Sequence, residues 1–223
     1  ASSNNFISDY ADNWECHVIR LPFIMVQIIL ASASPSRLML LKSAGVNPTV
    51  LVSGVDEEAP EFDSLSATEL VIKLAGLKAN AVRGLAPINS LIIGCDSTFE
   101  FNGKPLGKPL NRETAIERSK AISGNFGYLH TGHCIIDTKQ GREIFKLSTA
   151  KVQFAEITDA EIVDYVDSGE PLNVAGGFTL DGLSAPFISS IEGDPSGIIG
   201  LSLPLLRNMV ISLGYSWLDI KNN

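Results

Sequence analysis

Two short segments of the sequence carry side chains suited to binding anions. The first is A-S-A-S-P-S-R, residues 31–37, in which hydroxyl residues precede an arginine. At the start of a helix, backbone N–H groups and the positive end of the helix dipole attract phosphate. Ser34 and Ser36 add hydroxyl donors, and the planar guanidinium of Arg37 matches phosphate oxygens. The same pattern is also typical of an ordinary serine-capped helix with a solvated arginine.

The second segment is G-C-D-S-T-F-E-F-N-G-K-P-L-G-K-P, residues 94–109. Asp96 stands at the end of an apolar strand pattern, where ligands commonly bind in α/β sheets. A carboxylate there can hold Mg²⁺ or take a proton from water. Lys108 lies between glycine and proline, which places a cation on a stiff loop. A capping aspartate and a solvated lysine turn would give the same letters.

Two further charged positions fit the same chemistry. Glu57 lies in the acidic turn 56–58, which follows an apolar run. Lys78 lies near the apolar stripe of a predicted helix, so its stem can pack while its ammonium group reaches a cleft. The alternatives are a solvated acidic turn and a lysine whose head stays in water.

The cysteines and histidines point away from metal and thiol chemistry. Cys16, Cys95 and Cys134 are scattered, no C-x-x-C is present, and the pattern suits a reducing compartment. On a strand, His130 and His133 would face opposite sides, which argues against a shared metal. No Walker A sequence and no G-x-S-x-G occurs.

The composition narrows the class of partner. The chain has 223 residues, 45% of them hydrophobic, and a formal net charge of −8. This is enough to bury a sizeable core, and the acidic balance argues against a nucleic-acid polymer as partner. A small anionic substrate is compatible, because a few clustered cations can outweigh a distant acidic surface. No apolar run approaches the roughly 20 residues that span a bilayer, so we expect no membrane partner.

The N-terminal region could be taken for a secretory signal, because the apolar stretch 21–31 ends in small residues. A signal needs a basic segment before that stretch. Residues 1–20 instead carry three acidic residues against the single Arg20. Met25 reads well as a natural start. We therefore expect residues 1–24 to be an extension of unknown role and residues 25–223 to form one domain.

The elements that must position these side chains can be predicted from periodicity and turn residues. Strands are predicted at 26–31, 49–55, 90–101 and 185–191, with a hairpin over 128–154. Helices are predicted from Pro35 to Gly45 and over 66–84, 111–123, 158–166 and 203–213. Strands and helices interleave, but hairpins are present too. The pattern predicts an α/β fold with a mixed sheet.

Together the segments resemble the Maf family of nucleotide pyrophosphatases, and the likeness runs from about Met25 to Asp219. It rests on I-I-L-A-S-A-S-P-S-R, on G-C-D-S with G-K-P-L-G-K-P, and on the pairs Ser123-Gly124 and Thr131-Gly132. It rests also on S-G-E-P-L-N-V-A-G-G-F-T-L-D-G followed by I-E-G-D-P-S-G-I-I-G-L-S-L-P-L-L. The order and spacing of these segments make the resemblance specific.

The resemblance implies a fold like that of the inosine-triphosphatase group: a long curved mixed sheet with flanking helices and a cleft between two lobes. It implies cytoplasmic hydrolysis of nucleoside triphosphates, unusual or modified ones included, to monophosphate and pyrophosphate with a divalent cation, Mg²⁺ or Mn²⁺. It also implies a homodimer. The alternatives are a nucleotide-binding regulator of septum formation and cell division without essential catalysis, and a house-cleaning pyrophosphatase for deaminated purines.

The resemblance also implies roles for individual residues. Asp96 matches the proposed general base and a metal ligand, and Glu57 matches an acidic residue near the metal and the water. The groups that match phosphate-binding positions are Ser34, Arg37, Lys78 and Lys108.

The resemblance also implies that subgroups of the family differ from one another at three further positions, here Ser36, Ser97 and Asp181. The thymidine and uridine triphosphate subgroup has arginine, threonine and glutamine there, and this chain has none of them. The 7-methylguanosine triphosphate subgroup tends to have an acid at the position of Asp181. An acid can accept hydrogen bonds from guanine or balance a methylated, cationic base. The resemblance therefore predicts a preference away from pyrimidines.

Overall fold

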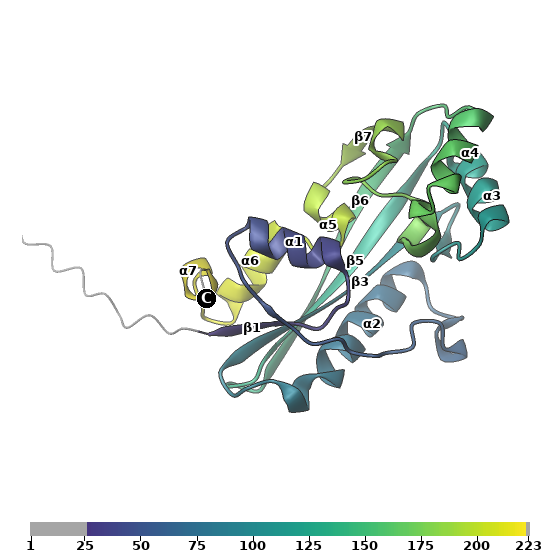
Figure 1. Ribbon diagram of the computed structural model, residues 1–223. Coiled ribbons are helices and arrows are strands. Elements are labelled where there is room, and N and C mark those ends of the chain that lie inside the picture. Colours follow the sequence, from purple (N-terminus) through teal and green to yellow (C-terminus); the bar gives the residue numbers. More distant parts are fainter. Residues whose placement is uncertain (1–25, 222–223) are drawn as a thin grey trace, which may run out of the picture.

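The computed structural model describes residues 26–221, which fold around a seven-stranded mixed sheet (Figure 1). The expected extension, residues 1–24, lies outside the described residues. The strands are β1 (Gln27–Leu30), β2 (Thr49–Val50), β3 (Ser90–Phe101), β4 (Lys104–Leu106), β5 (Phe126–Asp137), β6 (Arg142–Phe154) and β7 (Ile188–Glu192). The helices are α1 (Pro35–Ser43), α2 (Ala67–Ala81), α3 (Arg112–Ile122), α4 (Asp159–Asp167), α5 (Pro195–Ile199), α6 (Leu203–Ser212) and α7 (Trp217–Ile220).

The strand order confirms the prediction of a mixed α/β sheet. The order is β2-β1-β3-β5-β6-β7, with β4 paired to β3 as a hairpin. The β2-β1-β3 part is parallel, and the β3-β5-β6-β7 part is antiparallel. Among the helices of residues 26–221, none is both long and apolar enough to cross a bilayer.

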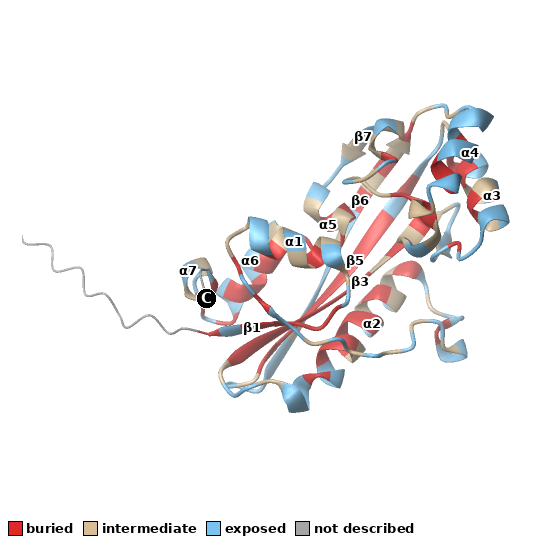
Figure 2. Cartoon of the chain, in the orientation of Figure 1, coloured by how far each residue is buried: buried red, intermediate tan, exposed pale blue. Residues whose placement is uncertain are grey.

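The first lobe surrounds the end of the sheet that carries β1. Helices α1, α6 and α7 lie over one face, and α2 lies over the other (Figure 1). Odd-numbered residues of β3 such as Leu91 and Ile93 pack toward α6, whereas Ile92 packs toward α2. Because successive side chains of a strand point to opposite faces, the near-continuous apolar run of β3 fills two cores at once. Figure 2 shows the buried residues concentrated on these central strands.

The second lobe surrounds the other end of the long strands and carries α3 and α4 (Figure 1). Its core includes an aromatic group in which Phe178 packs edge-on against Phe99 and Phe154, with ring centroids 5.1 and 5.0 Å away. Such edge-to-face contacts add to the area that the rings bury. Strands β3, β5 and β6 run through both lobes, so one continuous sheet connects them.

Helix α2 lies very close to the sheet because glycines face it. A Cβ atom at Gly94 on β3 would collide with the carbonyl oxygen of Ala75, and one at Gly132 on β5 would collide with that of Val71. Asp96 follows Gly94 by two residues and therefore points to the same face. The close approach brings the side chain of Lys78 on α2 to the carboxylate of Asp96.

One edge of β3 changes partner in the middle of the strand. It pairs with β1 as far as Ile93 and with β4 from Phe99 onward. Between them, along residues 94–98, no strand of the described region pairs with this edge. Asp96 and Ser97 lie in that gap and point to opposite faces of the sheet. An interval between two strand partners is where a ligand can reach β3 from the side.

Two predicted strands are wrong in part. The run predicted as a strand over 49–55 pairs with β1 only at Thr49–Val50, because β1 itself ends at Leu30 and a strand needs a partner. Beyond it the chain becomes a loop. The strand predicted at 185–191 is observed at 188–192, because residues 185–187 form a 3₁₀ turn containing Pro186. Helices α5 and α7 are additional to the prediction.

Candidate active site

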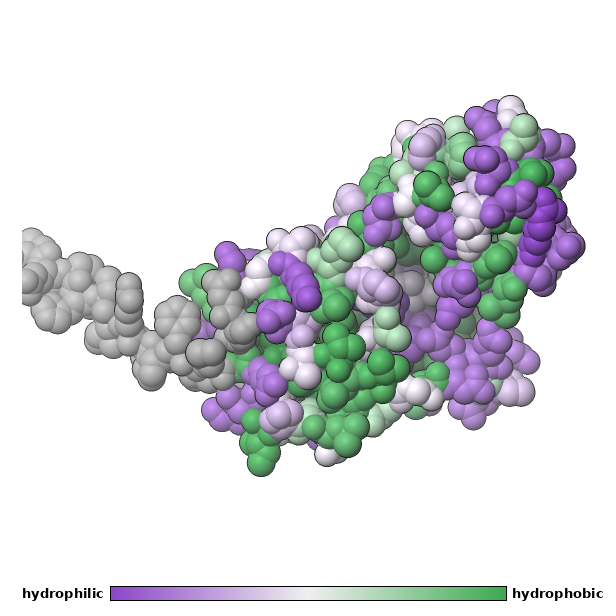
Figure 3. Space-filling model, in the orientation of Figure 1, coloured by the Kyte–Doolittle hydropathy of each residue, from purple (hydrophilic) through white to green (hydrophobic). Residues whose placement is uncertain are grey.

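A cleft of about 500 Å³ opens between the two lobes. Figure 3 shows the surface hollowed between α1 and the second lobe. All of the residues singled out from the sequence line this cleft: Ser34, Ser36, Arg37, Glu57, Lys78, Asp96, Ser97, Lys108 and Asp181. Segments far apart in the chain therefore converge on one place.

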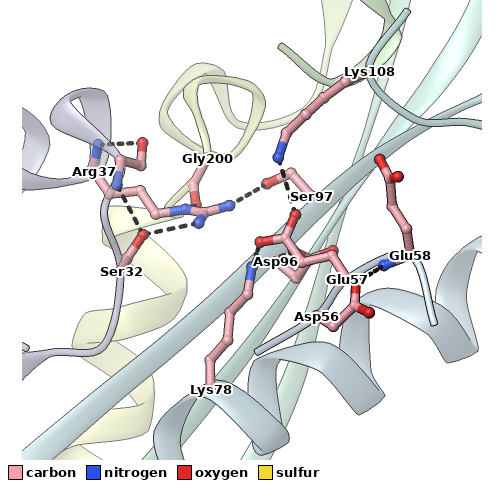
Figure 4. A network of polar contacts seen from close by, with 11 residues as sticks. Ser32, Arg37, Asp56, Glu57, Glu58, Lys78, Asp96, Ser97, Lys108 and Gly200 are labelled. Carbon is pink, nitrogen blue, oxygen red and sulfur yellow. Dashed lines mark hydrogen bonds and ion pairs between the residues drawn. The ribbon is translucent and has the colours of Figure 1, made fainter. Parts of the chain in front are cut away.

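The centre of the cleft is a chain of ion pairs (Figure 4). The ammonium group of Lys78 donates to Asp96 Oδ1 at 2.6 Å and lies 2.6 Å from Glu57 Oε1. Lys108 donates to Glu57 Oε2 at 3.1 Å. Asp96 and Lys78 are buried, whereas Lys108 is exposed. A buried charge is stable when it is paired, so the buried carboxylate of Asp96 requires Lys78.

The two carboxylates have different acidities. Burial raises the pKa of Asp96 above its usual range, and the nearby cations Lys78 and Arg37 oppose that shift without cancelling it. Partial burial also acts against ionisation of Glu57, but the ion pairs with Lys78 and Lys108 lower its pKa to about 2. Glu57 therefore stays ionised at neutral pH, and Asp96 is the stronger base.

Arg37 lies on the floor of the cleft and connects three segments (Figure 4). Its Nε donates to Gly200 O at 2.8 Å, and its terminal nitrogens donate to Ser32 Oγ and Ser97 Oγ, each at 3.1 Å. A guanidinium group has five N–H donors, and these bonds use three of them. The remaining N–H groups leave Arg37 able to bind an anion while it holds the site together.

The serine turn before α1 is already hydrogen-bonded. Ser34 is the N-cap and accepts from the backbone N–H of Arg37 at 3.4 Å, and Ser32 Oγ accepts from the N–H of Ser34 at 3.2 Å. The backbone N–H groups of Ser34 and Arg37 therefore already have acceptors. For these two groups, the expectation that they are available to phosphate is wrong. Each hydroxyl keeps its own proton to donate. Ser36, half-buried at the second helical position, also lines the cleft.

Ser97 is part of a hydroxyl chain behind Arg37. Thr131 Oγ1 donates to Gly197 O at 2.8 Å and lies 2.9 Å from Ser97 Oγ. Because the only hydroxyl proton of Thr131 goes to Gly197, Ser97 donates to Thr131 and accepts from Arg37. Sequence reasoning did not assign Thr131 a role. The pair Thr131-Gly132 was part of the motif pattern, but the sequence does not show which residues the threonine hydroxyl would contact.

The second wall of the cleft is formed mainly by loops. It contains the residues Asn173, Val174, Ala175, Phe178, Thr179, Leu180 and Asp181, together with Leu129, Ile198 and Ile199. Except for Asp181, the sequence singled out none of these as site residues. The residues between 173 and 181 lie in loops and short turns without helical or strand periodicity, so no pattern in the sequence shows which of them face the cleft. Their apolar atoms suit a flat ring, and their polar atoms suit its edges.

Among the described residues, the histidines His130 and His133 do not line the cleft. His130 shares a hydrogen bond with Thr149 Oγ1, and His133 is held between Thr131 O and the backbone N–H of Ser202. Burial lowers the pKa of His133 to about 4. Within residues 26–221, no three His, Cys, Asp or Glu side chains group so that they could hold a metal. The cysteines of that region, Cys95 and Cys134, are buried free thiols.

Asp96 and Glu57 nevertheless suit a divalent cation. They are hard oxygen donors facing the same lysine in an open cleft. Mg²⁺ is usually held by one or two carboxylates together with substrate phosphates and water, and it does not need a complete protein cage. The donor set therefore fits Mg²⁺ or Mn²⁺ in the presence of a phosphorylated ligand.

Comparison with known proteins bears directly on this arrangement. The family model described as Maf-like protein matches residues 27–213, which include every residue of the ion-pair chain. The chain belongs to the Maf family. The match lies inside the expected domain, residues 25–223, and confirms the resemblance found in the sequence.

Several proteins similar to this Maf-family chain carry the same name, which states an enzymatic activity. A nucleoside triphosphate pyrophosphatase from Streptomyces coelicolor is 51% identical over 84% of this chain and 91% of its own length. Proteins of the same name from Leifsonia xyli subsp. xyli and Thermosynechococcus vestitus are 46% and 45% identical, over 88% and 89% of this chain and 97% and 99% of theirs. The solved structure of a nucleoside-triphosphatase / dITP/XTP pyrophosphatase from Mycobacterium abscessus aligns with 83% of this chain and 98% of its own. The identity is 15% and the TM-score is 0.39.

Proposed function

We propose that this protein hydrolyses nucleoside triphosphates to nucleoside monophosphates and pyrophosphate in the cleft between its lobes. The observation that carries the proposal is the chain Asp96–Lys78–Glu57–Lys108, which places two carboxylates of different acidity among cations. The names of the relatives support the same activity. A triphosphate carries about four negative charges, so its cleavage requires charge neutralisation and positioning more than covalent help from the protein.

Asp96 is the general base in this proposal. The oxygen of a water molecule bonds to the α-phosphorus while its proton passes to Asp96. The bond to the bridging oxygen of the β-phosphate breaks, and pyrophosphate leaves with the electron pair. A carboxylate with a raised pKa takes a proton more readily, and the pKa of Asp96 is raised by burial. Lys78 keeps the carboxylate oriented through its 2.6 Å hydrogen bond.

The cations neutralise the phosphates. Arg37 offers its remaining N–H groups, and exposed Lys108 can turn from Glu57 toward a phosphate oxygen. The hydroxyls of Ser34 and Ser36 donate from the start of α1. A divalent cation bound by Asp96, Glu57 and the phosphates would neutralise the charge that develops on the leaving group.

The second wall supplies recognition of the nucleoside. Asp181 is exposed at the cleft, where its carboxylate can accept from the N1–H and N2–H₂ groups of guanine. A thymine or uracil ring has a single N–H on that edge between two carbonyl oxygens, which an acid repels. The proposal therefore includes a preference for purine, and above all guanine-like, substrates.

The experiment is pyrophosphate release from a panel of normal, deaminated and methylated nucleoside triphosphates with Mg²⁺ or Mn²⁺. Asp96→Asn should lower kcat by at least about a hundredfold, the usual loss on removing a general base. The matched control is Asp164→Asn, an exposed aspartate on α4 that does not line the cleft. Because the proposal includes a divalent cation, chelation of that cation with EDTA should abolish pyrophosphate release from wild type.

Each alternative has its own outcome in that experiment. Tight nucleotide binding without pyrophosphate release would indicate a nucleotide-binding regulator and contradict the hydrolase proposal. Selective cleavage of inosine triphosphate would indicate the house-cleaning role toward deaminated purines. The cytoplasmic location and the homodimer implied by the resemblance stay predictions, and light scattering of the purified protein tests the second.

A further inference from the structure

Glu170 collects four hydrogen bonds close to the second wall without lining the cleft itself. Its Oε1 accepts from the hydroxyl of Tyr165 at 3.2 Å and from Thr179 Oγ1 at 2.7 Å. The backbone N–H of Leu183 donates to both carboxylate oxygens, each at 3.0 Å. Partial burial acts against ionisation, yet these donors together hold the pKa of Glu170 below its usual value.

These bonds fix the loop that carries Asp181. Thr179 and Leu183 lie on either side of Asp181, and both are bound to the same carboxylate. The hydroxyl of Ser184 closes the loop a second time, because it accepts from the N–H of Thr179 and donates to its carbonyl oxygen, both at 2.7 Å. The loop is therefore closed by Ser184 and anchored by Glu170.

The anchor point also belongs to the cleft wall. Glu170 begins the 3₁₀ turn Glu170–Asn173, whose last residue lines the cleft. Gly182 lies so near that a Cβ atom there would come within 2.6 Å of Glu170 Oε2. One carboxylate thus fixes the separation between the turn that presents Asn173 and the loop that presents Asp181.

We propose that Glu170 is a positioning residue for nucleoside recognition, which holds Asn173 and Asp181 at a fixed separation on either side of the bound base. The inference rests on the proposed function, because it concerns how the same cleft selects the nucleoside part of its substrate. Glu170 acts through these two residues and does not touch the substrate. The phosphate-binding side chains on α1, α2 and β3 make none of these hydrogen bonds to the Glu170 carboxylate. The loop of Lys108 meets the turn only through backbone, where the N–H of Leu110 donates to Leu172 O at 3.1 Å.

The test compares a ligand that uses both ends of the cleft with one that uses the phosphate end alone. The first is a guanosine triphosphate analogue in which a methylene group replaces the oxygen between the α- and β-phosphates, so that it cannot be cleaved there. The second is inorganic tripolyphosphate. Calorimetry gives both dissociation constants for wild type, Glu170→Ala, Glu170→Gln and the control Glu161→Ala. Glu161 is a carboxylate of the α4 capping box and lies outside the cleft.

Glu170→Ala should weaken the nucleotide analogue roughly tenfold, the effect of losing one charge-assisted hydrogen bond, and leave tripolyphosphate within about twofold. Glu170→Gln keeps an oxygen for Thr179 and Leu183 and should restore most of the affinity. Equal weakening of both ligands by Glu170→Ala, or of neither, would overturn the inference. If wild type binds the analogue but cleaves no nucleoside triphosphate, the proposed function fails while the affinities still decide the role of Glu170. If wild type does not bind the analogue, both are wrong.

Discussion

The two walls of the cleft are held together by different forces. The phosphate wall, which contains Ser34, Ser36, Arg37, Glu57, Lys78, Asp96 and Lys108, depends on charge. Asp96 on β3 and Glu57 both lie 2.6 Å from the buried ammonium group of Lys78 on α2. The second wall, called the nucleoside wall below, depends on hydrogen bonds within loops, such as those that Thr179 and Leu183 donate to Glu170. In the proposed function the central pair of reactive groups, Asp96 and Lys78, is thus attached to a rigid sheet and its helix, while Glu57 and Lys108 reach them from loops. The same proposal assigns recognition of the nucleoside to loop segments, which can change in sequence without disturbing the sheet and helix.

The largest effect should come from Lys78→Met. This substitution leaves two carboxylates facing each other without their shared cation. Removing one partner of a buried ion pair should cost about 3 kcal/mol of unfolding free energy, and kcat should fall at least about a hundredfold. Urea unfolding and pyrophosphate release measure the two losses. Lys73→Met, an exposed position on the same helix, is the control. A stability equal to that of Lys73→Met would show that the phosphate wall is not held by charge.

The next effect should come from Gly94→Ala. The added Cβ collides with the backbone carbonyl of Ala75, so α2 must move away from the sheet and carry Lys78 with it. Overpacking of this kind costs about 1–3 kcal/mol. We expect that loss in thermal unfolding, together with weaker binding of tripolyphosphate. Gly84→Ala, where nothing lies within 4 Å of the new methyl group, should leave both unchanged. If Gly94→Ala and Gly84→Ala have the same thermal stability and the same affinity for tripolyphosphate, the close approach of α2 to the sheet does not position Lys78.

A smaller effect should appear in how the stability of the fold depends on pH, through the carboxylate of Glu57. Its folded-state pKa of about 2 lies below the ordinary value of 4.5. The ionised form therefore stabilises the fold above pH 4.5, and this contribution is lost as the pH falls from 4.5 toward 2. Glu57→Gln should lose less stability than wild type across that interval, and chemical unfolding at several pH values measures it. Parallel curves for the two proteins would contradict the ion-pair arrangement.

The smallest effect should come from Asp181→Asn in the nucleoside wall. Asp181 is exposed, so the melting temperature should stay within about a degree of wild type. The ratio of kcat/KM for guanosine over thymidine triphosphate should fall about fivefold to tenfold, because the amide loses one acceptor for the guanine edge. Competition assays with both nucleotides measure that ratio directly. An unchanged ratio would remove Asp181 from base selection.

Much of the fold follows from local patterns that tertiary contacts do not override. Ser66 and Thr158 cap their helices in capping boxes, and Pro35 starts α1 as its fixed φ angle favours. The long strands β3 and β5 follow from apolar runs and turn residues. Those signals act over a few residues, so they can be recognised in one sequence.

The partial misprediction at 49–55 has a different origin. Its apolar alternation is a genuine strand pattern, but β1 ends at Leu30 and offers no partner beyond Val50. The rest of the run became the loop that brings Val52, Ser53 and Glu57 to the cleft. Whether a strand continues depends on its neighbour, which lies elsewhere in the chain.

The sequence by itself determined which side chains are available for chemistry, since motif order and residue type were enough to select Asp96, Arg37 and the lysines. It could not show that Lys78 joins Asp96 to Glu57, or that Glu170 stands behind Asp181. Those facts depend on contacts between residues 18 or more positions apart for Lys78, and on loops without periodicity for Glu170. Tertiary structure decided them, because ion pairing, burial and the resulting pKa values exist only once distant segments have packed together.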